Sequence, residues 1–252
     1  MANFDQDRMQ SGATISRGNA AIDEGLRSYM LSVYNYMAGG LALTGVVAYL
    51  AFQFAVVQTP DGSLALTSAG AALYQSPLKW VVMLAPLGMV FFLSARISKM
   101  SVSTAQISFW LFAGLMGLSL SSIFLIYTGA SITQTFFVTA IAFGGLSLYG
   151  YTTKRDLTGF GSFLIMGVIG LLVASVVNIW LASPMIQWAV SVLGVLIFAG
   201  LTAYDTQRIK EMYYVGDAAA TASKKAIMGA LSLYLDFINM FMFLLQLFGN
   251  RR

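Results

Sequence analysis

The sequence predicts an all-α membrane protein with seven transmembrane helices. Hydrophobic residues make up 58% of the 252 residues, charged residues make up 10%, and the mean hydropathy is +0.76. A typical soluble domain has about 45–50% apolar and about 25% charged residues. The charges are also unevenly distributed, because they separate long uncharged stretches. These three observations exclude an ordinary soluble domain and a disordered protein.

Three uncharged stretches, two long and one short, predict the first four helices. A helix needs about 20 apolar residues to cross roughly 30 Å of hydrocarbon. Residues 28–60 carry no charge and predict one helix, roughly Val33–Val57. The run 80–95 predicts a second helix. The long run 100–153 predicts a third and a fourth, joined by a polar turn near Thr128–Thr133.

The last three helices lie in the C-terminal third of the sequence. The uncharged run 157–204 predicts two helices with a turn near Ser183–Pro184. The apolar stretch Ala226–Phe248 predicts the seventh and is interrupted only by Asp236. We expect this stretch to cross the membrane completely, because it contains no proline. A re-entrant hairpin is the alternative, although irregular backbone at membrane depth must be sheltered by protein or water.

The domain organisation is simple. Residues 1–27 are expected to form a polar cytoplasmic N-terminal segment, and residues 28–252 a single seven-helix transmembrane domain. No small-residue cleavage site follows a short apolar core near the N-terminus, so no cleaved signal peptide is expected. The longest connections are expected at 58–77 and 206–225.

The sequence contains no His and no Cys. This excludes catalytic triads, cysteine nucleophiles, haem ligation and metal sites built from imidazole or thiolate. Any ion that the protein handles must therefore meet oxygen ligands, and no cofactor is expected. The net charge of +4 is better explained by membrane topology than by nucleic-acid binding, so we expect a lipid bilayer and no nucleic acid as partner.

Lys and Arg predict the orientation, because they are enriched in cytoplasmic loops. With a cytoplasmic N-terminus, eleven of them fall inside and three outside. Those inside are Arg8, Arg17, Arg27, Arg96, Lys99, Lys154, Arg155, Arg208, Lys210, Lys224 and Lys225, and those outside are Lys79, Arg251 and Arg252. The C-terminal arginine pair on the outer side is the exception to the rule.

Three ionisable residues fall within or at the edge of the predicted helices, where charges are costly and by default functional. Asp205 is expected to end the sixth helix, Asp236 lies inside the seventh, and Arg96 ends the second. The sixth and seventh helices are antiparallel neighbours, and the two carboxyl groups are expected at similar depths. A direct approach of Asp205 and Asp236 is therefore feasible.

Two adjacent carboxyl groups titrate as a unit, because both cannot ionise cheaply. A shared proton would hold the two helices together at low pH, and deprotonation would separate them or recruit a cation such as Ca²⁺ or the Arg96 guanidinium. Ca²⁺ takes six to eight oxygens. Asn239, Thr206, backbone carbonyls and waters are candidates to complete a weak, open site.

Simpler interpretations remain open for each residue. Asp205 is then an interfacial residue that pairs with Arg208, three positions along the helix. Asp236 then makes a structural hydrogen bond between helices, and Arg96 extends its charge to the membrane surface as a topology signal. Glycines such as Gly114 and Gly117 are expected to permit close helix packing.

Three segments resemble the Bax inhibitor-1 family, in its bacterial branch. They are Thr202–Ile209, with its Tyr-Asp-Thr-Gln element, Leu231–Asn239 and Phe241–Gly249. The resemblance covers about Leu26 to Gly249. It implies a seven-helix fold whose last helix is central and surrounded by the other six. It also implies a bacterial inner-membrane protein with a pH-sensitive Ca²⁺ leak, in which Asp205 and Asp236 form the gating pair and Arg96 is their partner.

Two functional hypotheses follow. The first is a proton-regulated calcium leak channel or sensor. The second is a non-conducting stress protein that modulates a membrane-anchored ATP-dependent protease, a role linked to some bacterial relatives. An enzyme is not expected, because both Glu24 and Glu211 lie outside the predicted helices and neither aspartate has a Gly-x-Gly-Asp context. A secondary transporter is a further alternative, although no matched pair of broken helices supports it.

Overall fold

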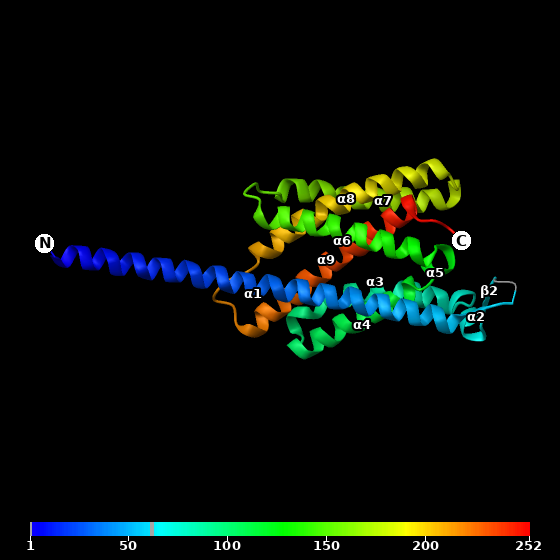
Figure 1. The fold of residues 1–252 in the computed structure, drawn as a ribbon, viewed down its shortest axis with the longest axis horizontal. Helices are drawn as coiled ribbons and strands as arrows, with labels where there is room; N and C mark the ends of the chain where they lie inside the picture. Colours follow the sequence, from blue (N-terminus) through cyan, green and yellow to red (C-terminus); the bar gives the residue numbers. More distant parts are fainter. Residues whose placement is uncertain (1, 61–62) are drawn as a thin grey trace.

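The computed structural model describes residues 2–60 and 63–252, with side chains from residue 24 onward, and is almost entirely helical (Figure 1). The long helices are α1 (Ala2–Ala55), α3 (Leu78–Arg96), α4 (Val102–Leu120), α6 (Gly129–Thr152), α7 (Thr158–Leu181), α8 (Pro184–Glu211) and α9 (Ala219–Phe248). The short elements are the strands β1 (Val56–Gln58) and β2 (Leu64–Leu66), the helices α2 (Ser68–Tyr74) and α5 (Ile123–Ile126), and a 3₁₀ turn, η1 (Ile97–Lys99).

Hydroxyl side chains begin three of the transmembrane helices. The side-chain oxygens of Ser101, Thr128 and Ser183 accept hydrogen bonds from backbone N–H groups at the starts of α4, α6 and α8. Such caps satisfy N–H groups that have no partner within the helix. Ala182 in the α7–α8 turn has φ 46°, and Pro184 then opens α8, so this turn is as tight as the sequence predicts.

Seven helices of the described residues are long and apolar enough to cross a membrane, which confirms the predicted number of helices. The first span, Glu24–Ala55, begins earlier than predicted, and the helix α1 continues on its N-terminal side beyond the bundle (Figure 1). No backbone break therefore marks the expected boundary at residue 27.

The predicted connection 206–225 is wrong, because α8 continues to Glu211 and α9 already begins at Ala219. Asp205 consequently lies within α8 rather than at its end. Charged side chains can occupy the turns of α8 and α9 that lie within the predicted connection, because these side chains reach polar partners. Lys210 donates to the carbonyl of Tyr151 at 2.8 Å, and Lys225 donates to the carbonyl of Met212 at 2.9 Å.

The helix α9 is the most buried of the seven spans. In its most apolar stretch 67% of the residues are buried, against 11–33% in the others. It packs against α8, α1, α6, α4 and α3, while α7 packs on α8. Encirclement by all six other helices is not confirmed. A single continuous helix from Ala219 to Phe248, about 45 Å long, is sufficient to cross the bilayer and leaves no room for a re-entrant hairpin.

The end of the bundle at which the C-terminus lies is closed by short elements. The strands β1 and β2 pair antiparallel, and α2 packs against α1 and α3. Tyr127 pairs with Arg251, and the N–H of Thr128 donates to the carbonyl of Asn250 at 3.0 Å. The backbone after α9 is thus hydrogen-bonded to the α5–α6 turn.

Large apolar side chains are exposed along the outer helices, especially α3 and α7. Examples are Val81, Leu84, Phe91, Phe163, Met166, Leu172 and Trp180. In water such a surface would drive association. In a bilayer it is the lipid-facing surface, and the arrangement is that of an integral membrane protein.

Candidate carboxylate site

The two intramembrane aspartates lie in the interface between α8 and α9, the most extensively packed helix pair in the bundle. Asp205 is 9% exposed and Asp236 is 5% exposed. Because α8 and α9 are consecutive and antiparallel, residues in the last two turns of α8 meet residues near the middle of α9. The contacts of Arg208 with Ser232 and of Phe198 with Phe243 set the register of the two helices, and this register places Asp205 and Asp236 at the same level of the interface.

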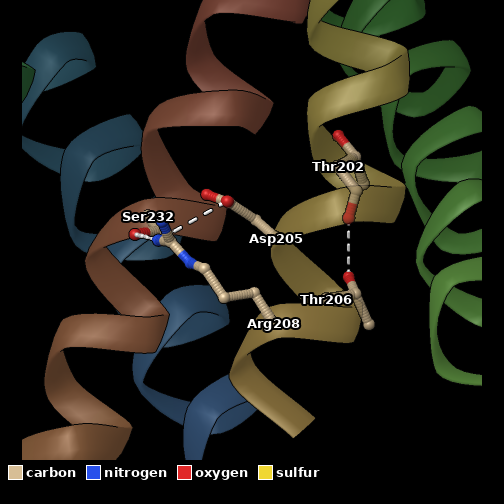
Figure 2. Close-up of polar contacts among 5 residues, drawn as sticks. All are labelled: Thr202, Asp205, Thr206, Arg208 and Ser232. Atoms are coloured by element: carbon tan, nitrogen blue, oxygen red, sulfur yellow. Dashed lines mark hydrogen bonds and ion pairs between the residues drawn. The ribbon is translucent and has the colours of Figure 1, made fainter. Parts of the chain in front are cut away.

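Arg208 connects the two helices at this level. Its Nη2 atom lies 3.5 Å from Oδ1 of Asp205 and donates to the hydroxyl of Ser232 at 3.4 Å. Figure 2 shows Asp205 and Arg208 projecting together from α8 toward Ser232 on α9. Ser232 and Asp236 are four residues apart, so they lie on the same face of α9.

The second carboxyl oxygen of Asp236 is unusual. Within the described part of the protein, Oδ2 of Asp236 is buried and has no hydrogen-bond partner. A buried polar atom without a partner costs free energy, and a buried unpaired charge costs more. The arrangement is therefore suited to hold a proton on the carboxyl pair, or to receive a water molecule or a cation beside it.

The other predicted site residues are only partly brought together. Arg96 is exposed at the end of α3 and has no ion pair among the described residues, so Arg208 occupies the position expected for it. Thr206 projects from α8 away from Asp205 (Figure 2), donating to the carbonyl of Thr202 at 2.7 Å. Asn239 lies one turn beyond Asp236 and donates to the carbonyl of Leu235 at 2.8 Å.

These placements limit the kind of cation site that is possible. No cluster of three or more Asp, Glu, His or Cys side chains that would hold a metal occurs among residues 2–60 and 63–252. Two carboxylates supply too few oxygens for a tight Ca²⁺ site. The remaining ligands would have to be backbone carbonyls and waters, which is the donor set of a transient site rather than a storage site.

The residues next to Asp205 hold α8 in place from its other faces. Thr206 Oγ1 lies 2.9 Å from Ser147 Oγ on α6, which in turn lies 2.6 Å from the Tyr34 hydroxyl on α1. The Gln207 amide donates to the carbonyl of Arg155 and accepts from the N–H of Leu157. The Tyr-Asp-Thr-Gln element thus combines one residue facing the carboxylate site with two that anchor α8.

Sequence reasoning missed the roles of Arg208 and Ser232. Arg208 lies three positions after Asp205, and the sequence predicts their pairing only if Asp205 is an interfacial residue. Asp205 pairs with Arg208, as the interfacial interpretation predicts, but it is also buried, as the carboxyl-pair interpretation predicts. The position of Ser232 could be predicted from the sequence, because it lies four residues before Asp236 and therefore on the same face of the helix.

Comparisons with known proteins agree with this architecture. A family model described as "Inhibitor of apoptosis-promoting Bax1" matches residues 26–252. The inner membrane protein YbhL of Escherichia coli is 49% identical over 90% of this protein and 94% of its own length. Protein RP147 of Rickettsia prowazekii is 46% identical over 95% of this protein and 96% of its own length. A Caulobacter vibrioides protein is 49% identical over 94% of both proteins.

Proposed function

Since the chain belongs to the Bax inhibitor-1 family and is a multi-pass protein of the bacterial inner membrane, we propose that it is a pH-sensitive calcium leak pathway gated by Asp205 and Asp236. The observation that supports this most directly is the buried carboxyl pair between α8 and α9, with one oxygen of Asp236 left without a partner among the described residues. A purely structural pair would be expected to satisfy that oxygen.

Gating would depend on the number of protons that the carboxyl pair holds. With one proton shared between them, the two carboxyl groups attract each other and keep α8 and α9 in contact. When the proton leaves, two negative charges share a buried interface with one arginine, Arg208. The excess negative charge then favours separation of the helices or entry of a divalent cation, because buried charges require a counter-charge.

The test is calcium flux into liposomes that contain the purified protein, measured between pH 5 and 8. The wild type should conduct more as the pH rises through the titration of the pair. Asp236→Asn, which cannot ionise, should lose most of the flux at high pH and flatten the pH profile, and Asp205→Asn should act in the same direction. If both variants retain the wild-type flux and pH profile, the proposal fails.

Asp156→Asn is the matched control. Asp156 lies in the loop before α7, and hydrogen bonds from the side chain and the backbone N–H of Thr158 lower the pKa of its carboxyl group. Asp156 therefore stays ionised throughout pH 5–8 and contributes nothing to a pH response in that range. An asparagine oxygen accepts the same hydrogen bonds, so the variant should retain the wild-type profile. A changed profile would mean that flux responds to charge anywhere on the protein.

A second candidate function is modulation of a membrane-anchored protease. The projection of α1 beyond the bundle favours it, because that part of the helix extends away from the other helices and is available to a partner (Figure 1). Removal of residues 2–20 should abolish co-purification with such a protease while leaving liposome flux intact. Co-purification that survives the deletion would argue against this handle.

A further inference from the structure

Along the α8–α9 interface, polar and aromatic side-chain contacts follow one another. Side-chain contacts pair Arg208 with Ser232, Phe198 with Phe243, and Ser191 with Gln246, in the order that two antiparallel helices require. On α9 the residues Asp236, Asn239, Phe243 and Gln246 follow one another at intervals of three or four, so they share one face. We refer to this strip of both helices as the α8–α9 seam.

The seam is polar at the end near the α7–α8 turn. The hydroxyl of Ser191 donates to Oε1 of Gln246 at 3.0 Å. Two adjacent open cavities of about 300 and 290 Å³ share Gln187 and Gln246 in their walls, and Asn178 and Arg251 contribute to one each. We call this region the amide vestibule. Its space and its amide and hydroxyl groups suit water and a partly hydrated ion.

An aromatic layer separates the amide vestibule from the carboxylates. The rings of Phe198 and Phe243 are stacked, with centroids 5.9 Å apart and an interplanar angle of 29°. Phe243 also lies directly against Gly194, where an added Cβ would come within 2.5 Å of the ring. Along α9, Phe243 is about 10 Å from Asp236 and about 5 Å from Gln246.

We infer that the α8–α9 seam is the route by which water and cations reach the carboxyl pair, and that the Phe198–Phe243 stack is the barrier that closes it. Hydrophobic constrictions block ions because a narrow apolar passage does not hold the water that an ion needs. The absence of a side chain at Gly194 lets the Phe243 ring pack directly against α8. The identity of the ion rests on the proposed function, but the position of the barrier does not.

The amide vestibule also indicates a slow pathway. Among the described residues, Arg251 is the single charged residue in the walls of the two cavities, and it is positive. A cation entering from this end meets amide and hydroxyl oxygens but no carboxylate until it passes the aromatic layer. This arrangement disfavours accumulation of cations at the mouth, as expected for a leak rather than a high-throughput channel.

Calcium flux in liposomes tests the barrier. Phe243→Ala and Phe198→Ala should each raise the flux at least threefold, and Phe243→Leu should raise it less because it retains part of the apolar volume. Phe241→Ala is the matched control, since Phe241 is buried on another face of the same helix, near Phe136. If Phe241→Ala raises the flux as much as Phe243→Ala, the effect is general loosening and the inference is overturned.

Cysteine accessibility tests the same barrier without reference to calcium. The protein has no cysteine, so single cysteines can be introduced into the full-length protein without background labelling. A small charged thiol reagent should label Gln246→Cys in membranes and should not label Asn239→Cys. In the Phe243→Ala background, Asn239→Cys should become labelled at a rate close to that of Gln246→Cys.

Equal labelling of both positions in the otherwise wild-type protein would overturn the inference, and so would continued protection of Asn239→Cys after removal of the Phe243 ring. These outcomes are separate from those of the proposed function. If the aspartate variants leave calcium flux unchanged while the labelling pattern holds, the seam and its barrier stand and the calcium assignment fails.

Discussion

At the scale of single residues, buried hydroxyl groups hold the helices in register. The Tyr234 side chain is completely buried on α9, and its hydroxyl lies 2.7 Å from Thr44 Oγ1 on α1. Thr44 donates its own hydroxyl proton to the carbonyl of Ala113 on α4, at 2.8 Å. Thr44 has only one proton to donate, so Tyr234 must be the donor to Thr44. One threonine therefore links three helices.

Because Thr44 both accepts and donates a hydrogen bond, its replacement should cost more stability than removal of the Tyr234 hydroxyl. Thr44→Val leaves the Tyr234 hydroxyl buried without a partner and should lower the free energy of unfolding by about 1–3 kcal/mol, whereas Tyr234→Phe should cost about 0.5–1 kcal/mol. Thermal unfolding in detergent with both single variants measures the difference. The assignment of donor and acceptor would be wrong if Tyr234→Phe were the more damaging change.

At the scale of elements, α1 and α4 pack through backbone contact. A Cβ atom on Gly117 would lie 2.6 Å from the carbonyl oxygen of Thr44, whereas a Cβ on Gly114 would meet nothing within 4 Å. Both glycines lie in α4, one turn apart. The sequence pattern of small residues suggested close packing for both, and only Gly117 has it.

The two positions give a matched pair of substitutions. Gly117→Ala should lower the free energy of unfolding by about 1–3 kcal/mol, because backbone must move to admit the methyl group. Gly114→Ala should be neutral or stabilise by up to about 1 kcal/mol through the higher helix propensity of alanine. Chemical denaturation in mixed micelles, followed by circular dichroism, distinguishes them. Equal effects at both positions would contradict the packing described for α4.

At the scale of the whole molecule, seven crossings place successive connections on alternate sides of the membrane. The connection 153–157 carries Lys154 and Arg155. At the same end, Lys224 and Lys225 lie near the start of α9. The opposite end carries the β1–β2 hairpin and α2. The excess of Lys and Arg at the first end predicts that it faces the cytoplasm.

Single cysteines on the two ends test this orientation. Lys154→Cys should react with an impermeant thiol reagent in inverted membrane vesicles and be protected in intact spheroplasts. Gln75→Cys, after the end of α2, should show the opposite pattern. Labelling of both positions from the same side would refute the alternating topology, and a reversed pattern would refute the predicted orientation.

Hydropathy and charge spacing were sufficient to predict the number of helices, because a helix in lipid must be apolar over a defined length. They misplaced the ends of α8 and α9, since Arg208, Lys210 and Lys225 reach polar partners while remaining helical. Composition of a segment cannot distinguish a charged loop from a charged helix end whose side chains find carbonyl or hydroxyl groups.

Part of the candidate site could also be predicted from the sequence. The scarcity of buried charges identified Asp205 and Asp236, and the antiparallel order of their helices predicted their proximity. The choice of Arg208 over Arg96 as the cation depended on which side chains face the seam, and hydropathy carries no such information. The face of α8 that Thr206 occupies could have been predicted, since adjacent helical residues point about 100° apart.

The hydroxyl series from Tyr34 through Ser147 to Thr206 bears on how protons travel in this protein. Thr206 gives its proton to the carbonyl of Thr202, so Ser147 must donate to Thr206, and Tyr34 to Ser147. All three protons therefore point the same way and end on a carbonyl that cannot pass a proton on. The series is a static clamp between α1, α6 and α8 and cannot work as a proton relay. These hydroxyl groups therefore do not deliver protons to the carboxyl pair, so under the proposed function a proton would have to reach it through water in the α8–α9 seam.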